Sequence, residues 1–223
     1  VAPAIAPLVG GLLYTHVGWR SIFWLLALLG LAIGVAMARR LPESLEPARR
    51  QTFDLRNLLR GYASLLTSAK FLALVLASGV PFNGMFIYVL SSPAWLGELL
   101  QLQPTQFFWF FMLSVSGVML GAWWSGRLAG RLPPHEQIRR GFAIMALATV
   151  LNLLLNAALT PHAAWALLPV ALFSFGWSLM VPVVTLLVLD QAPERRGMAS
   201  SVQSSVGATA NALVAGIISP WVM

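Results

Sequence analysis

Side chains that could carry covalent or metal chemistry are scarce in this chain of 223 residues. The chain has no cysteine, and its three histidines, His16, His135 and His162, fall in predicted loops. No His/Glu spacing typical of zinc sites occurs, and no paired carboxylates lie inside an apolar stretch. The sequence therefore predicts no catalytic residue, no metal ligand and no enzyme.

Polar and aromatic residues inside apolar segments offer another chemistry, the non-covalent binding of an apolar molecule. Asn83 lies mid-segment after Pro81 and before Gly84, in a break that can open a helix and expose polar atoms to a cavity. Aromatic residues and methionine beside a few polar groups are typical of sites for hydrophobic molecules. The cavity candidates are Asn83, Phe82, Phe86, Trp177, Met180 and Gln203.

Packing is the alternative function for each of these side chains. Asn83 either lines a cavity or bonds within the helix packing, and Trp177 either forms an aromatic wall or packs against helices or lipid. For Asn152 and Asn156, one helical turn apart, hydrogen bonding between helices is the favoured interpretation.

Apolar segments must position these side chains. They span residues 1–13, 21–38, 70–90, 106–129, 140–159, 166–189 and 198–219. A helix needs about 20 apolar residues to cross a bilayer, a length that all but the first segment reach. The chain starts without Met inside an apolar run, so we expect a fragment that begins late in a helix.

The cations sort by alternate gaps between these segments. Thirteen of the 14 Lys and Arg residues lie in the gaps after the second, fourth and sixth segments, and Arg20 is the exception. Basic loops stay in the cytoplasm, so the pattern predicts a multi-pass inner-membrane protein with these gaps inside. The composition agrees, with 58% hydrophobic and 9% charged residues. The net charge of +7 then serves topology and membrane lipids, not nucleic acid.

The longest gap, 39–69, contains a second amphipathic pattern. Apolar residues between Phe53 and Leu66 recur every three or four positions, with Arg56 and Arg60 on another face. This spacing predicts a helix that lies on the inner membrane surface. A gap this long often joins two domains.

Six short motifs together resemble the major facilitator superfamily, and within it the bicyclomycin-resistance (Bcr/CflA) group of drug:proton antiporters. Residues 6–11 (APLVGG) look like the end of the family's motif C, and 126–131 (GRLAGR) resemble the second copy of motif A, with Gly130 where the family has aspartate. The other similar stretches are 18–23 (GWRSIF), 41–45 (LPESL), 88–93 (YVLSSP) and 193–200 (PERRGMAS).

The resemblance implies an all-α polytopic membrane protein with an incomplete major facilitator fold, from the end of helix five to helix eleven. Residues 1–38 would end the amino-terminal bundle, 39–69 would form the cytoplasmic linker, and 70–223 would belong to the carboxy-terminal bundle. It further implies a kink at Pro7, Gly10 and Gly11, and a gating role for Gly126, Arg127 and Arg131. For Arg127, Arg131, Arg139 and Arg140, topology and lipid contact is the alternative.

The function implied is export of hydrophobic or amphipathic drugs in exchange for protons by alternating access. A proton gradient would drive transport, so no cofactor is expected. The protein is expected to be a monomer. Antiport needs a buried carboxylate that titrates, which the resemblance places in amino-terminal helices. Uptake of a small metabolite is the main alternative, ahead of a membrane enzyme or a non-transporting receptor.

Overall fold

The computed structural model describes residues 2–42, 54–91, 93–101, 108–160 and 162–222, and within them the regular structure is helical throughout. The chain separates into two compact units, Val1–Leu58 and Leu59–Met223. This border falls inside one helix, α3, whereas the sequence analysis drew borders after residues 38 and 69. The three-part division stays a prediction.

The first unit contains α1 (Ala2–Val17) and α2 (Arg20–Arg40), which pack against each other. Gly18 joins them with a φ of +94°, a left-handed conformation that favours glycine. The Ser21 hydroxyl donates to the Gly18 carbonyl at 2.6 Å and holds this turn. Helix α2 is apolar on all sides and has no buried residue, as a membrane-crossing helix does.

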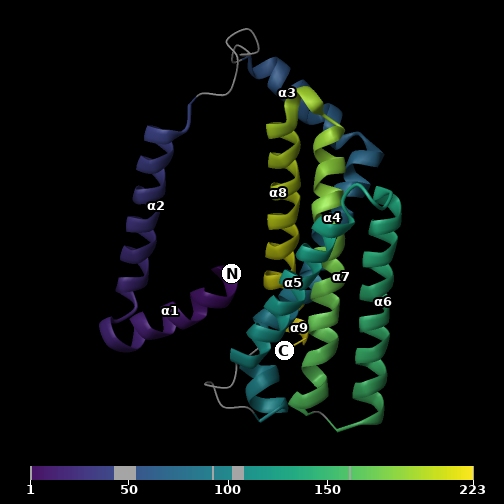
Figure 1. Cartoon of the computed structure of the whole chain (residues 1–223). Coiled ribbons are helices and arrows are strands. Elements are labelled where there is room, and N and C mark those ends of the chain that lie inside the picture. The colour runs from purple at the N-terminus through teal and green to yellow at the C-terminus, as the bar shows by residue number, and fades with distance from the viewer. Residues whose placement is uncertain (1, 43–53, 92, 102–107, 161, 223) are drawn as a thin grey trace. The chain divides into compact units, whose positions relative to one another are not determined.

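The second unit is built from long helices that run antiparallel to their neighbours in the chain (Figure 1). They are α4 (Ala69–Leu90), α5 (Phe108–Leu128), α6 (Pro134–Ala158), α7 (Ala163–Asp190) and α8 (Arg196–Leu213). The shorter helix α3 (Leu55–Leu66) lies obliquely at one end of them (Figure 1). Short helical turns complete it: η2 (Pro93–Leu99), η4 (Pro193–Arg195), η5 (Val214–Ile218) and α9 (Ser219–Val222). The α5–α6 and α7–α8 connections lie at the same end as α3 (Figure 1).

Helix α7 is the centre of this unit, because it packs on α4, α5, α6 and α8. Glycines bring its backbone close to two neighbours. Gly117 and Gly121 of α5 lie against the carbonyl groups of Ala171 and Phe175, and Gly141 of α6 lies against Gly176. Small residues permit such close approach, which is the main source of helix association in lipid.

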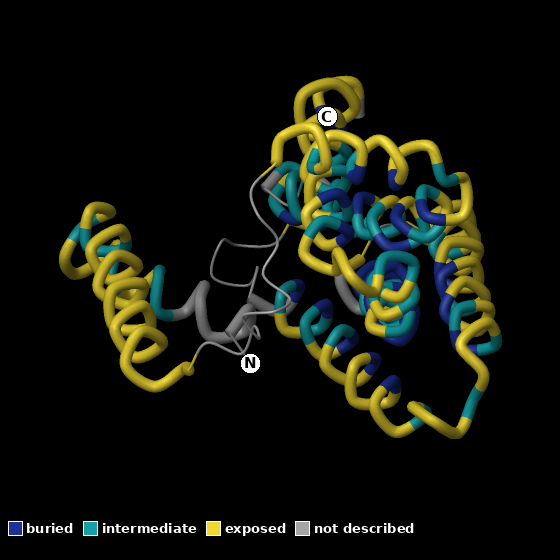
Figure 2. Tube along the Cα trace, turned by 90° about the horizontal axis from the view of Figure 1, so that it is seen from above, coloured by how far each residue is buried: buried dark blue, intermediate teal, exposed yellow. Residues whose placement is uncertain are grey.

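The second unit buries several polar side chains within its apolar core, and it exposes many large apolar ones. Its buried polar residues include Ser78, Asn83, Ser114, Ser125, Gln137, Ser174 and Ser178. Large apolar residues are exposed along α4 to α8, and the exposed positions follow the outer faces of the helices (Figure 2). Five described helices are long and apolar enough to cross a membrane. This arrangement confirms the predicted all-α polytopic membrane fold.

Two helix borders differ from the predicted segments. Helix α6 begins at Pro134, six residues before the predicted start at 140, because a proline suits the first helical position and a polar turn can project from the bilayer. His135 therefore lies in the first turn of α6, and His16 lies in the last turn of α1, although both were predicted in loops. Helix α5, whose predicted span starts at 106, is not among the five described membrane-span candidates.

Helix α3 has the amphipathic character that the sequence predicted. Its Gly61 and Leu65 are buried, and Leu65 joins a core with residues of α4, α7 and α8. Arg195 and Met198 lie directly over Gly61. Leu55, Leu59 and Leu66 stay exposed and form a second apolar stripe, while the position of α3 on the membrane surface stays a prediction.

Candidate functional site

An aromatic cluster forms where α4 and α7 meet, from three of the predicted cavity residues. The ring centroids of Phe82 and Phe86 lie 6.0 Å apart in a stacked arrangement, one helical turn from each other. The Trp177 ring of α7 lies 5.2 Å from Phe82. The structure therefore brings these three side chains together, although they are about 90 positions apart in the sequence.

A polar network next to this cluster links α4, α7 and α8. The Trp177 indole Nε1 donates to the Ser78 carbonyl at 3.2 Å. Gln203 Nε2 of α8 donates to the Ser78 hydroxyl at 3.0 Å and to the Thr185 hydroxyl at 3.2 Å. Gln203 thus joins three helices through one amide, and it shares Ser78 with Trp177.

Asn83 lies inside the helix packing rather than at an opening of α4. The helix continues through Pro81, and Asn83 Nδ2 donates to the Gly79 carbonyl at 3.1 Å. Its side chain is 7% exposed, and its Oδ1 has no hydrogen-bond partner among the described residues.

Met180 is the predicted cavity residue that lies apart from the aromatic cluster. It is fully buried, and Gly141 of α6 packs against its Cβ. Met180 therefore occupies the α6–α7 contact, where an unbranched, flexible side chain fills an irregular gap.

A cavity of about 230 Å³ lies among α4, α6 and α7. Asn152 Nδ2 donates to the Tyr88 hydroxyl at 3.1 Å at its wall, and Asn156 Nδ2 donates to Asn152 Oδ1 at 2.8 Å. The predicted hydrogen bonding of Asn152 between helices is confirmed. The lining residues are Gly84, Met85, Tyr88, Ala148, Thr149, Asn152, Leu153, Pro169, Val170 and Phe173.

The kink candidates lie in α1 of the first unit. The helix includes Pro7, Gly10 and Gly11 without interruption. A Cβ at Gly10 or Gly11 would meet nothing within 4 Å. Both glycines thus leave room for a helix to approach, while the kink at Pro7, Gly10 and Gly11 stays a prediction.

The gating candidates Gly126, Arg127 and Arg131 lie where α5 ends. Gly130, which stands in place of the family aspartate, has a φ of +74° and turns the chain. The backbone N–H of Arg131 then donates to the Leu128 carbonyl at 2.9 Å. The Arg127 guanidinium lies 4.4 Å from the Trp123 ring centroid. Neither arginine forms an ion pair with another described residue.

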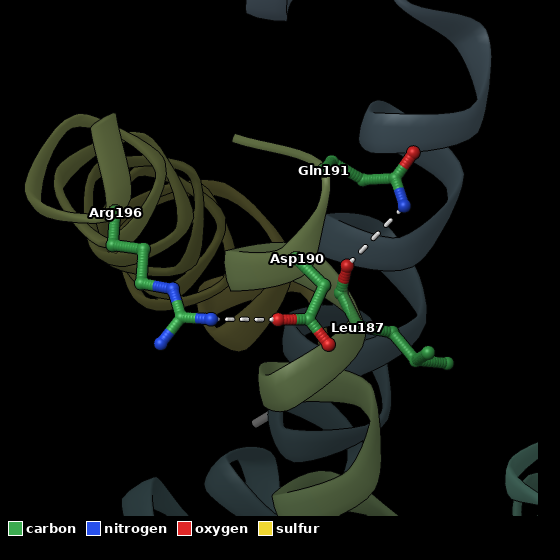
Figure 3. A network of polar contacts seen from close by, with 4 residues as sticks. All are labelled: Leu187, Asp190, Gln191 and Arg196. Carbon is green, nitrogen blue, oxygen red and sulfur yellow. Dashed lines mark hydrogen bonds and ion pairs between the residues drawn. The ribbon is translucent and has the colours of Figure 1, made fainter. Parts of the chain in front are cut away.

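Asp190 pairs with a loop cation at the end of α7. Its Oδ1 lies 3.1 Å from Arg196 Nη2, and its side chain is 58% exposed. Gln191 Nε2 donates separately to the Leu187 carbonyl at 3.4 Å (Figure 3). Because Asp190 is exposed at the helix end, it does not serve as a buried proton carrier in this structure.

One buried polar contact was missed by the sequence analysis. Gln137 is 1% exposed, and its Nε2 donates to the Ser125 hydroxyl at 2.7 Å and to the Leu179 carbonyl at 2.9 Å. It therefore joins α5, α6 and α7. Its place among His135, Glu136, Arg139 and Arg140 suggested a solvated loop, and the only signal for burial was its spacing of four residues from Gly141.

These features define a class of protein. Apolar helices face outward, aromatic and amide side chains meet between helices, and the described residues hold no group of three potential metal ligands among His, Cys, Asp and Glu. Such a bundle suits the passage of solutes through a membrane.

The comparison with protein families agrees. Residues 1–215 match the model of the Major Facilitator Superfamily, and the chain belongs to this family. It is a transporter-type chain rather than an enzyme, and a multi-pass protein of the bacterial inner membrane.

Curated relatives are similar along most of this chain. The Bicyclomycin resistance protein homolog of Haemophilus influenzae is 24% identical, with 97% of this chain and 55% of the relative covered. Multidrug resistance protein D of Escherichia coli is 27% identical, with 91% and 50% covered. Multidrug transporter MdfA of Yersinia pestis is 23% identical, with 92% and 50% covered. The chain spans about half the length of the curated relatives it matches.

Proposed function

We propose that the protein exports hydrophobic or amphipathic small molecules in exchange for protons, by alternating access. The observation that carries this proposal is the cluster of Phe82, Phe86 and Trp177 beside the amide of Gln203. Flat aromatic surfaces bind apolar molecules of many shapes, and a few polar groups orient them. The printed names of the relatives, which refer to multidrug resistance and transport, support the same conclusion.

An open face on α8 supports the alternating-access part of the proposal. A groove of about 570 Å³ runs between α3, α4 and α8, and small α8 residues such as Ser201, Ser205 and Thr209 line it. Small residues let another helix approach and slide with few steric barriers. We propose that these residues serve the rocking movement of alternating access rather than static packing alone.

The proton-carrying carboxylate is proposed to lie outside helices α4 to α8. In the described part of these helices, the acidic residues are Glu136 in the first turn of α6 and Asp190 at the end of α7. Both have arginine partners, Arg139 and Arg196. This bundle would therefore supply the substrate contacts, and the coupling acid would come from elsewhere in the full-length protein.

The test is transport by the full-length protein in proteoliposomes that contain a fluorescent amphipathic dye. A pH gradient imposed across the vesicle membrane is expected to drive dye against its own gradient, with protons moving the other way. Trp177→Ala is expected to reduce the initial rate about fivefold, since one aromatic contact contributes roughly 1 kcal/mol. Trp221→Ala, at a fully exposed tryptophan, is the matched control.

Three results would contradict the proposal. If the pH gradient drives no dye flux, proton antiport is wrong. If dye moves with the protons, the protein is an uptake carrier. If Trp177→Ala transports like the Trp221→Ala control, the aromatic cluster is not the binding site.

A further inference from the structure

The turn between α5 and α6 presents an exposed basic and aromatic surface that the transport proposal does not use. We call it the α5–α6 basic turn and define it by Trp123, Trp124, Arg127, Arg131 and Arg140. All five residues are exposed, and Trp123 is 51% exposed. The turn lies at the same end of the unit as α3 and the α7–α8 connection (Figure 1).

The packing of α5 directs Trp123 and Arg127 away from the bundle. Gly121 contacts Phe175 and Ser178 of α7, and Ser125 is buried against Gln137 of α6. Because successive residues of a helix are about 100° apart, Trp123 and Arg127 lie on the opposite face. The Arg127 guanidinium lies over the Trp123 ring at 4.4 Å, which holds a cation beside an exposed aromatic surface.

The positive charge of this surface is not neutralised within the described residues. No carboxylate of a described residue lies within ion-pair distance of Arg127, Arg131 or Arg140. Their neighbour Arg139 differs, since its Nη2 lies 3.0 Å from Glu136 Oε2. Three cations therefore remain for a partner, and a fourth, adjacent in sequence, is already paired.

The neighbouring tryptophans decide what kind of anion fits. Indole rings at the end of an apolar membrane helix prefer the boundary between acyl chains and headgroups. A soluble anion would use the arginines alone and leave both indoles in water. A phospholipid uses both, with its phosphate on the cations and its glycerol and upper acyl chain on the rings.

We propose that the α5–α6 basic turn binds the headgroup of an anionic phospholipid. Arg127, Arg131 and Arg140 contact the phosphate, and Trp123 and Trp124 contact the apolar part below it. This site is separate from the aromatic cluster of Phe82, Phe86 and Trp177, so it does not depend on the transport proposal. Binding of the lipid stabilises the turn and thereby the ends of α5 and α6.

The test is a lipid titration of the full-length protein in neutral detergent, followed by native mass spectrometry. The probes are dioleoyl phosphatidylglycerol, dioleoyl phosphatidylcholine and soluble glycerol phosphate. Phosphatidylglycerol is expected to bind more tightly than phosphatidylcholine. Each arginine removed is expected to weaken phosphatidylglycerol binding roughly fivefold, so R127Q/R131Q/R140Q together should weaken it roughly a hundredfold. R139Q, whose charge is already paired, should change it less than twofold.

Other outcomes would overturn the proposal. Equal phosphatidylglycerol binding by the wild type and the triple variant would do so, as would an equal loss in R139Q, which would indicate general surface charge. Glycerol phosphate that binds as well as the lipid would identify a soluble-anion site instead. If the triple variant does not fold, the single variants R127Q and R131Q replace it, and the expected loss for each is then roughly fivefold.

Discussion

At the scale of single residues, two amide side chains between helices hold this protein together. Gln137 and Gln203 each donate to groups on two other helices. Most of the surface is apolar, so the hydrophobic effect gives these helices little reason to associate in lipid. Hydrogen bonds between helices are therefore among the few specific contacts that determine how the helices pack.

Gln137→Leu removes the donors that join α5, α6 and α7. The Leu179 carbonyl loses this side-chain partner, and the Ser125 hydroxyl is left buried beside an apolar side chain. We expect the free energy of unfolding to fall by about 1–2 kcal/mol. Equilibrium unfolding in mixed detergent micelles, followed by circular dichroism, measures this change.

Gln191→Leu is the matched control for Gln137→Leu. The Gln191 side chain donates only within its own chain segment, to the Leu187 carbonyl, and is partly exposed (Figure 3). Its replacement should change the free energy of unfolding by less than about 0.5 kcal/mol. A cost at Gln191 equal to that at Gln137 would mean that the network among three helices has no special role.

Trp177→Phe separates the hydrogen bond of Trp177 from its ring contact. Phenylalanine keeps an aromatic surface against Phe82 but cannot donate to the Ser78 carbonyl. The free energy of unfolding should fall by about 1 kcal/mol, whereas Trp177→Ala should cost about 3 kcal/mol or more. The same unfolding measurement distinguishes the two, and equal losses would show that the indole N–H carries the whole contact.

At the scale of helices, α7 organises the second unit because glycines on α5 and α6 let it approach both. Gly141 is the clearest case, since a Cβ there would lie 2.7 Å from Met180 Cβ and 2.8 Å from the Gly176 carbonyl oxygen. Backbone and Cβ atoms cannot move aside as the end of a flexible side chain can. The close packing of α6 on α7 thus depends on one missing methyl group.

Gly141→Ala is therefore expected to push α6 away from α7 and lower the free energy of unfolding by about 1–3 kcal/mol. Gly207→Ala is the control, because a Cβ at that position of α8 meets nothing within 4 Å. Alanine favours helix over glycine, so Gly207→Ala should be neutral or slightly stabilising. A similar loss in both variants would show that the close contact at Gly141 does not decide the result.

The helices were largely predictable, but their packing was not. Apolar length predicted α4 and α7 to within a few residues, because a bilayer demands a fixed span. The border at Pro134 was missed, since polar residues such as His135 and Glu136 continue α6 beyond the apolar stretch. Apolar length also gave no sign that the closest glycine contacts lie at α5 and α6.

The candidate site was predictable in part for a similar reason. Residue type and the depth of each position within its apolar segment predicted Phe82, Phe86 and Trp177 as cavity residues. The structure places these three side chains together. Depth alone could not show that Met180 turns toward α6, because that depends on the rotation of α7 about its axis. Rotation is determined by contacts such as Gly141, which a single sequence does not reveal.

At the scale of the whole molecule, charge placement predicts which ends of the helices face the cytoplasm. Arg60 in α3 and Glu98 in η2 are both exposed, and α4 lies between them in the chain. The chain contains no cysteine, so a single introduced cysteine reports one position. In inside-out and right-side-out membrane vesicles, Arg60→Cys should react with a membrane-impermeant maleimide only from the cytoplasmic side, and Glu98→Cys only from the outer side.

Met145→Cys is the control for these labelling reactions, because Met145 is buried in the bundle and should not react from either side. Moving a segment that carries Arg56, Arg60 and Lys70 across the membrane would be unfavourable during insertion, so the expected difference between the two faces is large rather than graded. If Arg60→Cys reacts from the outer side, the predicted topology is wrong, and every helix that follows has the opposite orientation in the membrane. The α5–α6 basic turn would then face away from the cytoplasmic leaflet, where the phospholipid proposal needs it to be.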